Sequence, residues 1–214
     1  MSDFQSRCEK LIHTYKENGQ FWVSKNGTIN LGKDPDKPLF SCFSFYPPKD
    51  SEELVAYIKE NYKYHFPEEL LKFYSFSNGV KMFTAKIAFP EVTYLAHSCL
   101  DVFGFSDRSP EGCPFDIRIE DLGRGKTIPK QWLKCGSYSE PPFFDIDYDI
   151  YIDLDGRVYL TKKRESEIIW KYDSFESCFC SLFDTLAQKD FTTIYPSPSD
   201  WSDMYFKRKK KKKG

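Results

Sequence analysis

The sequence lacks long apolar runs, and no stretch approaches the roughly 18 apolar residues that identify a membrane-spanning helix. It also lacks G-x-S-x-G, H-E-x-x-H and P-loop motifs, which mark common hydrolase, metalloprotease and nucleotide sites. Histidine is scarce, and His13, His65 and His97 share no spacing that favours a catalytic or metal-binding trio. We therefore expect a non-enzymatic protein that needs neither a metal nor another cofactor.

The seven cysteines are odd in number, and no two of them have the two-residue gap of a zinc knuckle. We interpret them as buried free thiols in a reducing compartment. Apolar residues make up 40% of the chain and aromatic residues 18%, which is enough for a packed core. Together with the polar N-terminus, these features predict a folded cytoplasmic protein.

Charge is distributed unevenly along the chain. Lys207, Arg208 and Lys209 to Lys213 place seven basic residues in the tail. Removing these seven from the 31 basic residues leaves 24 against 32 acidic residues, a net charge of about −8 for the body. We therefore expect no specific nucleic-acid binding by the body, and only weak polyanion contacts by a solvated tail.

Apolar periodicity predicts an α+β protein with four helices and many short strands. Helix patterns cover residues 3–17, 50–61, 67–78 and 173–186, and capping boxes are expected at Asp50/Glu53 and Asp173/Glu176. Strand patterns cover residues 21–23, 28–31, 39–46, 82–89, 93–95, 115–119, 132–134, 144–154, 158–161 and 168–172. Residues 136–142 are interpreted as a loop.

The clearest strand pattern runs from Phe144 to Leu154 and ends in an Asp-Gly hairpin turn. One face is apolar, and the other carries Asp145, Asp147, Asp149, Tyr151 and Asp153. We expect the apolar face to lie inward and the carboxylates to line the outer face. Two interpretations stay open: a solvated face with lysines on neighbouring strands, or an acidic surface that steers a basic partner. The spacing does not fit an EF-hand.

Three segments carry a family resemblance. They are FPEELLKFYSFSNGV at Phe66–Val80, DIYIDLDGRVYL at Asp149–Leu160 and DSFESCFCSLFDTL at Asp173–Leu186. Their order and spacing resemble the SUKH superfamily, which includes bacterial immunity proteins and fungal cell-wall-synthesis regulators. The resemblance covers residues 48–187 and implies a mostly antiparallel sheet with helices packed on it. Residues 1–47 would form an N-terminal extension with a helix and short strands, and residues 188–214 a C-terminal extension with the basic tail.

The resemblance implies a protein that binds another protein without catalysis. An immunity or antitoxin-type protein would neutralise a cognate toxin domain, for example a nuclease, through an acidic, aromatic-rimmed surface. The candidate partner-binding residues are Asp145, Asp147, Asp149, Tyr151, Asp153, Tyr138 and Phe143. The alternative is a scaffolding or regulatory module without a toxin partner, like the fungal members.

Overall fold

The computed structural model describes residues 3–32, 42–61, 64–89, 92–104, 128–129, 131–140, 147–162 and 167–189. Over these residues the elements are α1 (Asp3–Glu17), β1 (Phe21–Val23), β2 (Ile29–Leu31), β3 (Cys42–Phe45), α2 (Ser51–Asn61), α3 (Glu68–Phe76), β4 (Val80–Phe89), β5 (Val92–Val102), β6 (Leu133–Ser139), β7 (Asp147–Ile152), β8 (Val158–Lys162), β9 (Ile168–Tyr172) and α4 (Phe175–Ala187). The predicted α+β class is confirmed. The strand expected at 115–119 and the basic tail lie outside the described residues.

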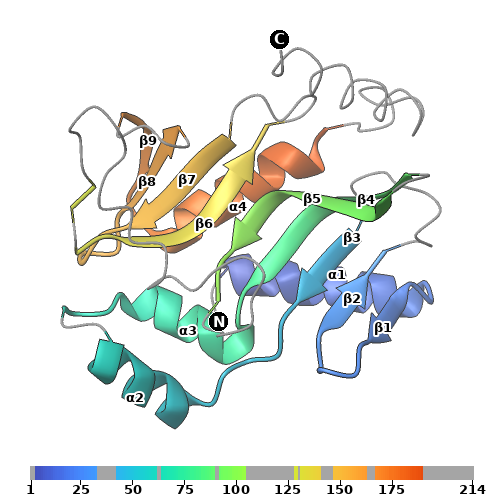
Figure 1. Ribbon diagram of the computed structural model, residues 1–214, viewed down its shortest axis with the longest axis horizontal. Coiled ribbons are helices and arrows are strands. Elements are labelled where there is room, and N and C mark those ends of the chain that lie inside the picture. Colours follow the sequence, from blue (N-terminus) through green and yellow to red (C-terminus); the bar gives the residue numbers. More distant parts are fainter. Residues whose placement is uncertain are drawn as a thin grey trace.

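All nine of these strands belong to one sheet whose spatial order follows the chain order from β1 to β9 (Figure 1). Each strand pairs antiparallel with the next. The expected N-terminal extension is part of this sheet, because β3 pairs directly with β4. β1 and β9 are therefore the two outermost described strands.

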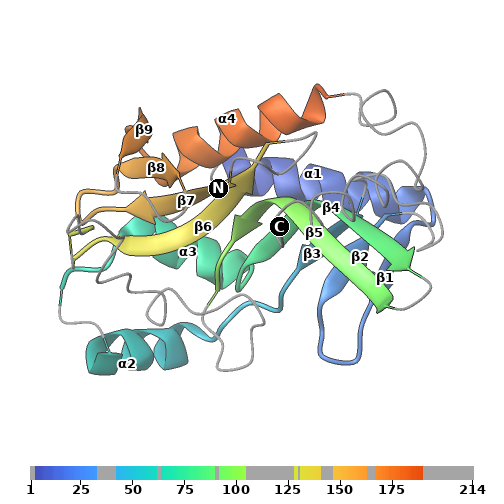
Figure 2. The ribbon, with the colours of Figure 1, turned by 45° about the horizontal axis from the view of Figure 1, so that its top comes forward.

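Helices α1 and α4 lie side by side along one face of the sheet (Figure 2). The ring of Phe4 on α1 lies 5.5 Å from Phe179 on α4 and 5.6 Å from Phe73 on α3, measured between centroids. An ion pair between Arg7 and Asp184 joins α1 to α4 at the surface. The aromatic rings fill the space between the helices and the sheet, where each buried side chain contributes roughly 1.5–3 kcal/mol.

The capping box of α4 lies one residue later than the sequence pattern predicts. Ser174 is the N-cap: its hydroxyl accepts a hydrogen bond from the backbone N–H of Ser177, and the Ser177 hydroxyl accepts one from the backbone N–H of Ser174. Asp173 is exposed just before this motif. The carboxylate of Glu69 accepts from the backbone N–H of Phe175 at 2.8 Å. Ser174 and Ser177 therefore form the capping box that the sequence pattern predicted for Asp173 and Glu176.

Strand β6 continues to Ser139, where the sequence analysis placed a loop. Gly136 lies at a register shift between β6 and β7. A Cβ atom at this glycine would meet the backbone oxygen of Asp101 at 2.3 Å and the ring of Phe179 at 3.1 Å. The glycine therefore allows β5 and α4 to approach β6. A glycine inside a strand often marks such a close approach rather than a turn.

Candidate functional site

Strand β7 is buried on both faces beyond its first residue, so the expectation of solvent-exposed carboxylates is wrong for Asp149 and for Asp153, which follows the strand. The apolar residues that alternate with the carboxylates along this strand belong to the main core under the helices. On the opposite face, Asp149 is 2% exposed and Tyr151 is 1% exposed. Tyr151 packs against Ile128 and Trp132, which form a second, small apolar cluster on this face. An alternating pattern predicts one solvated face only when nothing covers that face.

Asp149 is neutralised inside the protein by a lysine on the neighbouring strand. The Nζ atom of Lys134 lies 2.6 Å from Oδ1 of Asp149, and the two side chains are 9% and 3% exposed. The same ammonium group lies 5.7 Å from the ring centroid of Phe103. A lysine on a neighbouring strand is what the solvated-face interpretation expects, but this pair is internal. Asp149 therefore adds no charge to the surface.

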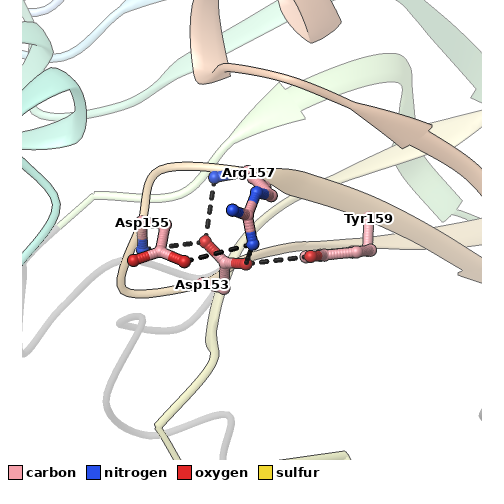
Figure 3. A network of polar contacts seen from close by, with 4 residues as sticks. All are labelled: Asp153, Asp155, Arg157 and Tyr159. Carbon is pink, nitrogen blue, oxygen red and sulfur yellow. Dashed lines mark hydrogen bonds and ion pairs between the residues drawn. The ribbon is translucent and has the colours of Figure 1, made fainter.

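Asp153 organises the turn between β7 and β8 (Figure 3). Its Oδ1 accepts hydrogen bonds from the backbone N–H groups of Asp155 and Arg157, each at 2.9 Å, and its Oδ2 accepts from the Tyr159 phenol at 2.8 Å. The Arg157 guanidinium lies 3.1 Å from Asp155 and 3.9 Å from Asp153. Gly156 has φ +84°, as an Asp-Gly turn requires. Burial, followed by the hydrogen bond to Asp153, raises the pKa of Tyr159.

Asp147 and Tyr138 lie where β6 ends and β7 begins. Asp147 is half-buried and accepts a hydrogen bond from the Ser139 hydroxyl at 2.7 Å. Tyr138 is buried and stacks on Tyr148, with 5.8 Å between the ring centroids. Burial, followed by the nearby charge of Glu140, raises the pKa of Tyr138. The two other candidates, Asp145 and Phe143, lie outside the described residues.

The large exposed apolar side chains of this region lie on the edge strand β9, where Ile168 is 47% and Trp170 is 38% exposed. The ring of Trp170 lies 4.9 Å from that of Tyr148, which links it to the stack with Tyr138. The register places Trp170 opposite Leu160 and Ile168 opposite Thr161, so these two side chains project from different faces of β9. We call the stacked rings of Tyr138, Tyr148 and Trp170 the aromatic edge. No sequence pattern singled out Ile168 and Trp170 as contact residues, although both belong to the Ile-Ile-Trp run of β9.

Little in the described parts of the chain suggests metal or thiol chemistry. No group of three or more His, Cys, Asp or Glu side chains is arranged there to hold a metal ion. The six described cysteines are free, and five of them are buried as predicted, whereas Cys180 is half-buried. Burial raises the pKa of the Cys8, Cys99, Cys135 and Cys178 thiols, which keeps them protonated and unreactive. Across the same residues, no helix has the length and apolarity to cross a membrane.

Comparison with known proteins does not extend the resemblance. The sequence matches no family model, no curated protein and no solved structure. The three motif segments do form the expected kinds of element: α3 leading into β4, the β7–β8 hairpin, and α4. Membership of the SUKH superfamily stays a prediction that depends on those segments.

Proposed function

We propose that this chain is a non-catalytic protein of the immunity or antitoxin type, which neutralises a cognate toxin, for example a nuclease, by binding it. The observation that carries the proposal is the exposure of Ile168 and Trp170 on β9, one of the two outermost described strands. Large apolar side chains on a sheet edge promote association with other chains, and tryptophan is enriched among residues that dominate binding energy. The resemblance to immunity proteins supports the same proposal.

The proposed contact surface is the aromatic edge rather than the row of aspartates on β7. Among the described candidates, Tyr138 is buried and supports the exposed Trp170 through its stack with Tyr148, and the half-buried Asp147 directly precedes Tyr148 in the chain. Asp149, Tyr151 and Asp153 are buried and have structural roles. Asp145 and Phe143 lie two and four residues before Asp147 in the chain and remain candidates. The net charge of about −8 on the body would still increase the association rate with a basic partner.

We also propose that the protein acts in the cytoplasm. Six free thiols in the described part of the chain suit a reducing compartment. The cytoplasm is the compartment in which an immunity protein would meet a toxin that attacks intracellular nucleic acid. If labelling of the native protein from cells found disulfide-linked cysteines, this location would be wrong.

The proposal is tested by co-expression with the protein encoded by the neighbouring gene. We expect the wild-type chain to form a complex with that protein and to rescue growth. Trp170→Ala should weaken both effects without unfolding the chain, because the side chain is partly exposed. Trp22→Ala is the matched control, because Trp22 is 41% exposed on β1 at the opposite edge of the sheet.

Each outcome of this experiment separates the candidate functions. Complex formation with growth rescue supports the immunity proposal. Complex formation with a partner that does not arrest growth favours the scaffolding alternative. If no complex forms while the neighbouring protein still arrests growth, the immunity proposal is wrong for that pair.

A further inference from the structure

A row of polar side chains crosses the face of the sheet opposite α1 and α4. Asp101 on β5 lies opposite Ser137 on β6, Ser137 lies opposite Asp149 on β7, and Asp149 lies opposite Thr161 on β8. Directly opposite residues of antiparallel strands project from the same face. The Ser137 hydroxyl donates to Asp101 at 3.2 Å, and Lys134 pairs with Asp149. The first three members of the row therefore have identified polar partners.

Two buried hydroxyl groups, that of Thr161 in this row and that of Tyr151 beside it, lack such a partner. Thr161 is fully buried and Tyr151 is 1% exposed. Within the described part of the chain, neither Thr161 Oγ1 nor the Tyr151 phenol oxygen has a hydrogen-bond partner. Leaving a buried hydroxyl without a hydrogen bond costs about 1–3 kcal/mol. Two such groups next to one ion pair indicate that something other than these protein residues satisfies them.

We propose that this face holds an internal water site, at which one or more bound water molecules connect the hydroxyls of Thr161 and Tyr151 to the Lys134–Asp149 pair. The chemistry of the groups favours a neutral ligand, because the lysine and the aspartate cancel each other's charge. An ammonium group has three donors, and Asp149 Oδ1 accepts only one of them. Water both donates and accepts, and a buried water molecule makes about three hydrogen bonds.

The water site has a structural consequence that is independent of the proposed function. Tyr151 and Asp149 lie on β7, Thr161 on β8 and Lys134 on β6. Bound water would therefore link side chains of three adjacent strands in addition to their backbone ladder. It would also give the Thr161 hydroxyl a role at a fully buried position of β8, where valine would have the same shape.

The substitution Thr161→Val tests the proposal by the sign of its effect on stability. It replaces the hydroxyl by a methyl group of the same shape. If water binds the hydroxyl, the melting temperature should fall by about 2–4 °C, which corresponds to the loss of about one hydrogen bond in a chain of this size. The matched control is Thr84→Val, because Thr84 is buried and shares a hydrogen bond of 3.0 Å with Ser98. A dry, unsatisfied hydroxyl would instead give a higher melting temperature for Thr161→Val, and that result would overturn the proposal.

A high-resolution crystal structure of the wild-type chain provides the direct test. We expect a density peak for water at hydrogen-bonding distance, about 2.5–3.0 Å, from Thr161 Oγ1. A protein atom at that distance from the hydroxyl, or a dry site, would refute the water site even if Thr161→Val lowers the melting temperature. This test does not depend on any partner, so its failure would leave the immunity proposal untouched.

Discussion

The ammonium group of Lys134 and the carboxylate of Asp149 meet at 2.6 Å inside the sheet, where both side chains are less than one-tenth exposed. Removing two charges from water costs several kcal/mol for each ion, and the attraction between them offsets this cost only when both are present. The aspartate that looked like the centre of an acidic surface is therefore one half of an internal, neutral pair.

Separating the Lys134–Asp149 pair by mutation should strongly destabilise the fold. Lys134→Met and Asp149→Leu should each lower the free energy of unfolding by roughly 3–5 kcal/mol, because each leaves one unpaired buried charge. The double variant removes both charges and should recover most of that loss. Urea denaturation of the four proteins measures the effect. If both single variants are as stable as wild type, the pair is solvated rather than internal.

The N-cap of α4 gives a second prediction about stability. Ser174→Ala removes the acceptor for the backbone N–H of Ser177 and should destabilise the protein by about 1 kcal/mol. Asp173→Ala is the matched control and should change the free energy of unfolding by less than about 0.5 kcal/mol, because Asp173 is exposed outside the cap. Chemical denaturation distinguishes the two. A larger loss for Asp173→Ala would restore the capping position expected from the sequence.

Buried thiols and phenols should make the protein lose stability at alkaline pH. Burial raises the pKa of Cys8, Cys99, Cys135, Cys178, Tyr138 and Tyr151 in the folded chain. In the unfolded chain these thiols ionise at about pH 8.5 and these phenols at about pH 10, as they do in peptides. Above those values the unfolded chain binds fewer protons than the native chain, so stability falls as pH rises.

Denaturation midpoints measured from neutral pH to about pH 11 check this expectation. The free energy of unfolding should be level near neutrality and decline from about pH 8.5 upward. The phenolate absorbance of the native protein should rise at a higher pH than that of the denatured protein. A constant free energy of unfolding across this range would show that these groups are accessible to solvent in the native state.

Local signals in the sequence were sufficient to predict several helices and strands. Helix α1 has the predicted bounds, Asp3–Glu17, because its apolar stripe and the following Asn-Gly are both local features. Asp50 caps α2 as predicted, since its carboxylate accepts from the backbone N–H groups of Glu52 and Glu53 at 2.8 and 3.2 Å. The β7–β8 hairpin follows from Asp-Gly, which favours a tight turn.

Long-range features could not be read from the sequence in the same way. The alternation in β7 predicts a strand, but whether its second face is solvated depends on Lys134 and Ile128, which are distant in sequence. The Ile-Ile-Trp run of β9 is typical of a buried strand, yet β9 is the last strand of the sheet among the described residues. The order of strands in a sheet decides which faces and edges reach solvent, and no local pattern encodes that order.

Affinity for the protein encoded by the neighbouring gene decides whether β9 is the contact surface. Calorimetric titration should compare wild type with Trp170→Ala and Trp22→Ala, after circular dichroism has shown that all three are folded. We expect Trp170→Ala to weaken binding by about 30-fold, as for a tryptophan that contributes about 2 kcal/mol, and Trp22→Ala to bind like wild type. Unchanged affinity for Trp170→Ala, or a larger loss for Trp22→Ala, would contradict a contact at the aromatic edge.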